Sequence, residues 1–330
     1  MQGLIALEEH LSTPRNNELW DAAGEAVRNG WAYMADVEAK LVDAEQRIAL
    51  MDRSGIATTI VSLTSPGVQG VLDSRQAVEL AREANDAVRR DFVDAYPGRL
   101  EFFAAVALQD PQAAADELER AVRELGAKGA LVNGYTNIGD QDTGRYLDHP
   151  DNAPFWTKVA ELDVPVYLHP REPLPSQRRL YEGYESLVGS AWGFGHETAT
   201  HAVRLMLSGL FDTRPNLKII LGHLGEGLPF LLPRLEHRLY KQREGTGLGA
   251  AQRRVSEYFN DNFLVTTSGH FHTRSLDDTI SAIGVDRVMF SVDYPYESMN
   301  EAVDWFTTCP LSHNDRAKIG RDNAKRLFGL

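Results

Sequence analysis

The sequence predicts an α/β protein built as a single (β/α)8 (TIM) barrel, and two observations carry this prediction. Eight short segments rich in Val, Ile, Leu and Phe recur along the 330 residues. Their apolar runs are too continuous for strands with one solvent-facing side, and are typical of parallel strands buried on both faces. Segments with helical periodicity lie between them, and this alternation predicts a parallel sheet. Eight such repeats favour a closed barrel.

Each expected strand is a short apolar run that leads into a loop. The eight runs are 3–8 (GLIALE), 57–64 (ATTIVSLT), 100–108 (LEFFAAVAL), 129–135 (GALVNGY), 164–169 (VPVYLH), 217–223 (LKIILGH), 262–268 (NFLVTTS) and 287–293 (RVMFSVD).

The helical pattern is clearest in residues 111–125, where apolar residues recur at i, i+4 and i+7. Asp110 is a plausible N-cap, Pro111 occupies the first turn, and Gly126 follows the last turn as a stop. The same reasoning predicts helices over 75–95, 197–210, 229–243, 274–283 and 298–308.

Two stretches interrupt the alternation and are expected to be long loops after strands 1 and 5. They are residues 11–42 and 170–196, and both contain aromatic residues. Loops of this length are uncommon unless they are functional, and both leave the strand ends where barrel active sites lie. An open doubly wound sheet is the alternative fold, but no glycine-rich phosphate turn follows the first strand. Without a linker or repeat, we expect one domain over residues 1–330.

The composition limits the classes of partner. A formal net charge of −13 disfavours nucleic acid, which would require a basic patch, and disfavours anionic membrane surfaces. No apolar stretch approaches the roughly 20 residues of a membrane span, and no signal peptide is recognisable. The single cysteine, Cys309, cannot form an internal disulfide. These features predict a cytoplasmic protein without membrane or nucleic-acid partners.

Several expected strands end on groups that can bind metal. Glu8 and His10 end strand 1, His169 ends strand 5, His223 ends strand 6 and Asp293 ends strand 8. Because residues i and i+2 of a strand share a face, Glu8 and His10 point the same way. In a closed barrel all five side chains would meet at one rim.

Any one of these residues alone has an ordinary explanation, such as a helix cap or a turn residue. Together, four strands that end on Glu, His or Asp at the same relative position favour a metal site. Carboxylate and imidazole ligands suit Zn²⁺, Mn²⁺ or Fe²⁺. An open position on such a metal can hold water or a substrate oxygen.

The motifs at these strand ends resemble the amidohydrolase superfamily. They are the "LEEH" that contains Glu8 and His10, the "HP" at His169, "GHLGEGLP" at 222–229 and "SVDYP" at 291–295. The resemblance is greatest to the metal-dependent aromatic acid decarboxylases, a branch that includes the γ-resorcylate (2,6-dihydroxybenzoate) and 2,3-dihydroxybenzoate decarboxylases. Hydrolytic members usually carry H-x-H on strand 1, whereas this sequence has Glu8 in place of the first histidine.

This resemblance implies roles for individual residues. One divalent ion, Zn²⁺ or Mn²⁺, would be held by Glu8, His10, His169 and Asp293. Besides its role as a ligand, Asp293 would be catalytic, together with His223 and its orienting partner Glu226. The residues implied to bind substrate are Arg234, Trp192, Phe194 and Tyr296.

The function implied is reversible, non-oxidative decarboxylation of an ortho-hydroxybenzoate such as 2,6-dihydroxybenzoate, 2,3-dihydroxybenzoate or salicylate. A small aromatic acid would then be the partner, in a homodimer or homotetramer. The alternative is a metal-dependent hydrolase of an ester, lactone or amide, in which the metal activates water and Asp293 acts as base. A barrel that binds a ligand without catalysis is disfavoured, because buried charge without a use is costly.

Overall fold

The computed structural model describes residues 3–19, 27–246 and 249–330. Its eight principal strands are all parallel to their neighbours and form two sheets, in the orders β1-β2-β3 and β10-β9-β8-β7-β4. The strands are β1 (Leu4–Leu11), β2 (Ile56–Leu63), β3 (Leu100–Phe102), β4 (Ala130–Asn133), β7 (Val166–His169), β8 (Ile219–Leu221), β9 (Phe263–Thr266) and β10 (Val288–Met289).

The two sheets join into a ring through single bridges at both seams. Ala104, just beyond β3, pairs with Ala130 of β4, and Glu9 of β1 pairs with Tyr294, beyond β10. The strand order around the ring therefore follows the chain. This confirms the expected (β/α)8 barrel and excludes the open doubly wound sheet.

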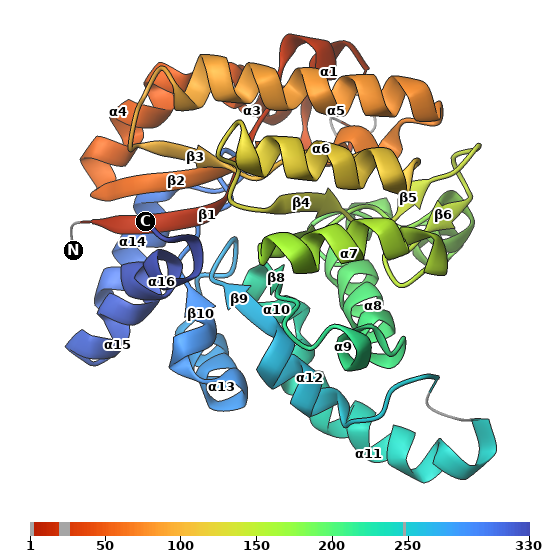
Figure 1. Cartoon of the computed structure of the whole chain (residues 1–330). Coiled ribbons are helices and arrows are strands. Elements are labelled where there is room, and N and C mark those ends of the chain that lie inside the picture. The colour runs from red at the N-terminus through yellow and green to blue at the C-terminus, as the bar shows by residue number, and fades with distance from the viewer. Residues whose placement is uncertain (1–2, 20–26, 247–248) are drawn as a thin grey trace.

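Helices surround the strands, with α5 and α6 on one side of the barrel and α12 and α13 on the opposite side (Figure 1). Asp110 caps α6 as expected, because its side chain accepts from the backbone N–H of Gln112 and Ala113. The α-helices are α1 (Pro14–Leu19), α3 (Trp31–Val42), α4 (Ala44–Ser54), α5 (Ser74–Val88), α6 (Pro111–Arg123), α7 (Ala153–Leu162), α8 (Gly193–Leu207), α9 (Leu210–Thr213), α10 (His223–Glu226), α11 (Leu228–Thr246), α12 (Val255–Asn262), α13 (Thr273–Ile283), α14 (Met299–Thr308), α15 (His313–Ala317) and α16 (Asn323–Phe328).

The two expected loops differ in content. The described part of residues 11–42 contains helices α1 and α3, and α3 buries Met34, Val37 and Leu41 at helical spacing. Residues 170–196 contain only two 3-10 turns before α8 begins. A short hairpin, β5 (Thr136–Asn137) with β6 (Gly144–Arg145), follows β4. None of the helices in the described ranges is long and apolar enough to cross a membrane.

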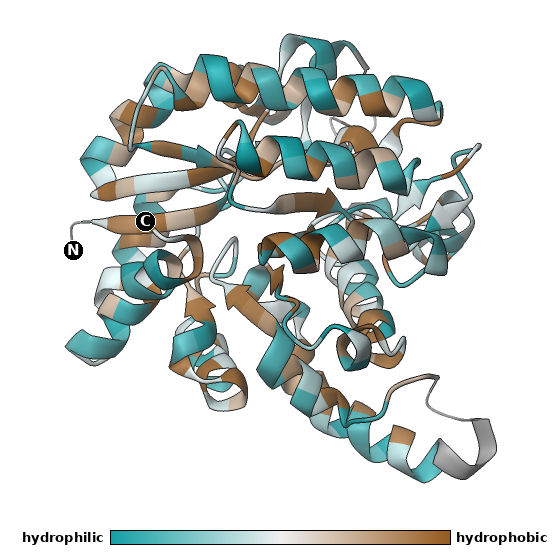
Figure 2. Cartoon of the chain, viewed as in Figure 1, coloured by the Kyte–Doolittle hydropathy of each residue, from teal (hydrophilic) through white to brown (hydrophobic). Residues whose placement is uncertain are grey.

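The strands carry much of the apolar sequence, whereas α5 and α6 alternate between polar and apolar residues (Figure 2). Ile5 and Leu7 of β1 belong to a cluster that fills the barrel interior, and the C-terminal helix α16 adds Phe328 to that cluster. The register of β1 against β2 is irregular between Ala6 and Glu9. A bulge of this kind changes the direction of side chains. Leu7 and Glu8 therefore both point into the barrel, although neighbouring residues of a regular strand point to opposite faces.

Candidate metal centre and active site

Four acidic and histidine side chains converge at the carboxyl ends of the strands. Glu8, His10, His169 and Asp293 each offer one ligand atom, and these atoms all lie within 4.8 Å of one another. Nε2 of His10 is 3.1 Å from Oδ1 of Asp293, and Nε2 of His169 is 3.3 Å from Oε1 of Glu8. The structure therefore brings together the four residues expected to bind metal.

The chemistry of this cluster fits one divalent cation. Oε1 of Glu8 and both ring nitrogens of His10 are buried and have no hydrogen-bond partner among the described residues. Buried polar atoms normally have partners, so unsatisfied nitrogen and oxygen atoms that face one another indicate a metal site. Two carboxylates and two imidazoles are a donor set that suits Zn²⁺ or Mn²⁺.

Neighbouring side chains fix which ligand atoms face the cluster. Oε2 of Glu8 accepts a hydrogen bond from the Tyr167 hydroxyl, which leaves Oε1 directed at the other ligands. Nδ1 of His169 lies 2.8 Å from Oδ1 of Asn133, so Nε2 is the free nitrogen. Hydrogen bonds of this kind orient metal ligands and select the histidine tautomer.

The electrostatics of His169 and Glu8 follow from their burial. Burial lowers the pKa of His169 well below its usual value, which keeps the imidazole neutral and able to bind metal. Burial also raises the pKa of Glu8, although His223 and His10 act against this shift. A cation at the cluster would favour the ionised carboxylate.

His223, Glu226 and Asp293 form a second polar unit beside the ligands. Nδ1 of His223 lies 2.8 Å from Oε1 of Glu226, and its Nε2 lies 3.5 Å from Oδ2 of Asp293. Burial opposes protonation of His223, but Glu226, Glu8 and Asp293 together raise its pKa well above the ordinary value. Burial likewise opposes ionisation of Asp293, yet His10 and His223 hold its pKa well below its usual range.

The backbone at this unit is strained. His223, Glu226 and Asp293 all adopt positive φ, at 49°, 55° and 80°. Residues other than glycine hold such conformations only when the surrounding structure imposes them, and they concentrate at functional sites. With these backbone conformations, His223 and Asp293 both line the cavity at the mouth of the barrel.

A cavity of about 270 Å³ opens over the metal cluster. His169, His223 and Asp293 line it together with Phe194 and Tyr296, two of the residues expected to bind substrate. Ser65 and Arg28 also line it, and neither was anticipated. The cavity wall therefore combines the guanidinium of Arg28 and two aromatic rings with residues of the metal cluster.

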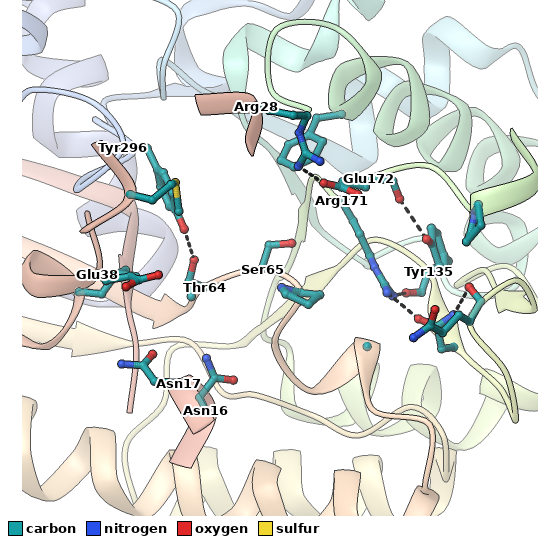
Figure 3. A pocket seen from close by; sticks show the side chains of 18 of the residues that line it. Asn16, Asn17, Arg28, Glu38, Thr64, Ser65, Tyr135, Arg171, Glu172 and Tyr296 are labelled. Atoms are coloured by element: carbon teal, nitrogen blue, oxygen red, sulfur yellow. Dashed lines mark hydrogen bonds and ion pairs between the residues drawn. The ribbon is translucent and has the colours of Figure 1, made fainter. Parts of the chain in front are cut away.

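A larger cavity of about 650 Å³ shares Arg28, Ser65, Phe194 and Tyr296 with the first. Figure 3 shows it with Tyr296 on one side and Arg171 on the other. None of the four candidate metal ligands lines it. We therefore place the chemistry in the smaller cavity, although the larger one has more room.

Two residues expected to bind substrate do not reach either described cavity. Arg234 is exposed on α11, which extends away from the barrel (Figure 1). Trp192 is 54% exposed, and its ring lies 4.6 Å from that of His196. Within one chain, Arg234 and Trp192 are exposed outside both cavities, and their contact with substrate stays a prediction.

Sequence reasoning missed several residues around the ligands. Asn133 ends β4, so the same pattern of a polar residue after an apolar strand would have identified it. Tyr167 lies within β7 and resembles any buried aromatic residue, so its contact with Glu8 had no local signal. Glycine is required at position 222 because the backbone there passes close to Glu8. A Cβ at this position would lie 2.4 Å from Oε2 of Glu8.

The fold and this site match known proteins. The family model described as "Amidohydrolase" matches residues 10–330, and the chain belongs to the amidohydrolase family. It is 48% identical over 331 residues to a gamma-resorcylate decarboxylase from Rhizobium sp. (strain MTP-10005), covering 100% of this chain and 99% of that relative.

Solved structures extend the similarity to the whole fold. A 2,6-dihydroxybenzoate decarboxylase complexed with 2,6-dihydroxybenzoate matches with a TM-score of 0.95 and 48% identity, over 100% of both chains. A dihydroxybenzoic acid decarboxylase from Polaromonas sp. JS666, with bound manganese and the inhibitor 2-nitroresorcinol, matches with a TM-score of 0.93 and 48% identity. This second match covers 100% of this chain and 98% of that one.

Proposed function

We propose that this protein is a metal-dependent decarboxylase of 2,6-dihydroxybenzoate, with Mn²⁺ as its metal. The observation that carries the proposal is the cluster of Glu8, His10, His169 and Asp293, which opens on a cavity with aromatic walls. The substrate class is supported by the relatives, one of which is complexed with 2,6-dihydroxybenzoate and another with manganese and a resorcinol inhibitor.

Decarboxylation replaces a ring C–C bond with a C–H bond. Direct loss of CO₂ would leave an aryl carbanion, so the ring carbon must first receive a proton. Held by Glu8, His10, His169 and Asp293, a divalent ion would stabilise the negative charge of the substrate's carboxylate and ortho oxygen. Phe194 and Tyr296 would then hold the ring between the ligands and the cavity wall.

We assign the proton transfer to Asp293, supplied by His223. Glu226 and the other nearby carboxylates keep a proton on His223, whose Nε2 lies 3.5 Å from Oδ2 of Asp293. The ionised Asp293 carboxylate accepts this proton transiently and passes it to the ring carbon. The electrons of the C–C bond return to the ring as CO₂ leaves, and solvent restores the proton.

A substrate panel with purified protein tests the activity. The panel is 2,6-dihydroxybenzoate, 2,3-dihydroxybenzoate, salicylate and 5-carboxyvanillate, each with Mn²⁺ or Zn²⁺, and chromatography resolves the phenols. We expect fastest conversion of 2,6-dihydroxybenzoate to resorcinol, abolished by a chelator. If protein with stoichiometric Mn²⁺ converts none of them, the decarboxylase proposal fails and lactones and esters become the substrates to test.

The His223→Asn variant tests the proton path. Loss of a positioned general acid or its supplier typically lowers rate about 10²–10⁴-fold. We therefore expect kcat to fall in that range while Mn²⁺ remains bound, because His223 is not among the four ligands. Unchanged kcat would remove His223 from the mechanism.

We also propose that the protein is a cytoplasmic homo-oligomer that uses the outer face of α11. Phe230 is 80% exposed and Tyr240 is 67% exposed on this helix, and Arg234 lies between them. Large apolar side chains exposed together on a helix are typical of an interaction surface. Arg234 could reach a substrate only across such an interface. Sedimentation of Phe230→Asp against the wild type tests this, with a smaller species expected for the variant.

A further inference from the structure

Behind the metal cluster, on the helix side of β1, one acidic and one basic side chain are completely buried. Glu9 and Arg47 are both 0% exposed, and neither lines a described cavity next to the ligands. Burial of charged groups is costly. The proposed mechanism uses neither residue, so their burial requires another explanation.

The bulge in β1 places Glu9 on this side. Glu8 and His10 face the metal cluster, while Glu9 between them contacts the segment after β10. There, Oε1 of Glu9 accepts hydrogen bonds from the backbone N–H of Val292, at 2.9 Å, and from the hydroxyl of Ser291, at 3.2 Å. Glu9 thus ties strand 1 to the residue that precedes Asp293.

Arg47 lies on α4 and contacts the same two segments. Its guanidinium donates to the backbone carbonyl of His10 and lies 4.6 Å from the ring centroid of Tyr294. His10 is a candidate ligand and Tyr294 directly follows another, Asp293, so both contacts of Arg47 fall on a ligand or its direct neighbour. Glu9 and Arg47 together therefore brace both segments that carry ligands at this seam of the barrel.

Little regular strand pairing joins β1 to the segment after β10. One bridge joins Glu9 to Tyr294, and backbone hydrogen bonds run from Asp293 N–H to Glu8 and from His10 N–H to Tyr294. Asp293 sits at φ 80°, a conformation that needs support from its surroundings. Side-chain contacts from Glu9 and Arg47 supply support that a continuous strand ladder would otherwise give.

We propose that Glu9 and Arg47 are positioning residues that hold Glu8, His10 and Asp293 in the geometry required for metal binding. This inference rests on the proposed metal site, but not on the identity of the substrate. The side chains act through the backbone, so their loss would weaken metal binding without removing a ligand.

The test is the dissociation constant for Mn²⁺, measured by competition with a chelating dye on folded protein. Glu9→Met removes the acceptor, and Arg47→Met removes the donor to His10, at similar side-chain size. We expect each to weaken Mn²⁺ binding about 10–100-fold, the range typical of groups that orient ligands. Glu9→Gln keeps an oxygen acceptor, so its Mn²⁺ affinity should stay close to that of the wild type.

Asn85→Leu is the matched control for simple loss of stability. Asn85 is buried and braces the segment after β3 through two hydrogen bonds with the backbone of Ala105, far from any ligand segment in sequence. We expect a lower Tm but unchanged Mn²⁺ affinity. Equal loss of affinity in Asn85→Leu at equal loss of Tm would overturn the proposal, as would wild-type affinity in Glu9→Met.

The double variant Glu9→Met/Arg47→Met covers the case in which a single variant does not fold. It leaves neither the acidic nor the basic group alone in the core, and replacement of both members of a buried pair by apolar residues is often neutral for stability. The proposal expects weak Mn²⁺ binding from this folded double variant, and wild-type binding would refute it. If wild-type protein binds Mn²⁺ but decarboxylates nothing, the proposed function fails while this test remains valid.

Discussion

At the scale of single residues, the site depends on partners that select one atom of each functional group. Asn133 leaves Nε2 of His169 free, and Tyr167 leaves Oε1 of Glu8 free. Glu226 orients His223 and stabilises its protonated form. The ligands and the acid–base pair are therefore specified by hydrogen bonds as much as by their own positions.

The Asn133→Ala variant tests this dependence at His169. Without the amide oxygen, the imidazole loses the partner that fixes its tautomer and ring orientation. We expect Mn²⁺ affinity to fall about 10–100-fold, as measured by metal titration, while the far-UV circular dichroism stays unchanged. Retention of wild-type affinity would mean that packing alone orients His169.

The Glu226→Gln variant tests the charge on His223 through the pH dependence of kcat. Protonated His223 is the proposed proton source, so activity is lost as pH rises through its pKa. Glu226 raises that pKa, and its removal lowers the pKa. The alkaline limb of the profile should therefore move to lower pH. The exposed Glu182→Gln is the control and should leave the limb in place.

At the scale of elements, short strands and their turns place the chemistry. β7 ends on His169, whereas β8 ends at Leu221 and β10 ends at Met289. His223 and Asp293 therefore lie on tight turns beyond their strands, with positive φ, rather than on the strands themselves. Such turns can aim side chains that a regular strand would direct elsewhere.

Gly222→Ala tests the close approach of one such turn to a ligand. A Cβ at this position would lie 2.4 Å from Oε2 of Glu8 and must displace that carboxylate or its own strand end. We expect at least a tenfold loss of Mn²⁺ affinity. Gly189→Ala is the control, since its Cβ would meet Arg28 at an ordinary 3.6 Å. Equal affinity in both variants would contradict this prediction.

At the scale of the whole molecule, the metal cluster links the two sheets of the barrel. Glu8 and His10 belong to the three-stranded sheet, His169 belongs to the five-stranded sheet, and Asp293 lies at the seam between them. A cation bound by all four would crosslink strands far apart in sequence. It would also neutralise carboxylates that are costly to bury.

Metal removal should therefore lower the thermal stability of the whole barrel. A ligand that binds only the folded state stabilises it by about 2.7 kcal/mol at a concentration 100-fold above Kd. We expect calorimetry to show a higher Tm with Mn²⁺ than with a chelator. The Glu8→Gln variant should show a much smaller difference, and an equal difference would place the stabilising ion elsewhere.

Much of this protein followed from the sequence, because the signals are local. A strand buried on both faces must be apolar throughout, so the strand segments were recognisable, although β3 and β10 proved shorter than expected. Asp110 could be recognised as a helix cap from its neighbours in the chain. Glu8, His10, His169 and Asp293 were identifiable because each polar residue interrupts or follows an apolar run.

Only the tertiary structure decided which side chains meet. Arg234 and Trp192 have suitable chemistry, but within one chain their side chains are exposed and lie outside both described cavities. The burial of Glu9 and Arg47 depends on a bulge and on contacts between segments hundreds of residues apart. Local sequence determines conformation and chemical type over a few residues. The convergence of four ligands on one point is decided by closure of the barrel, which depends on the packing of the whole chain.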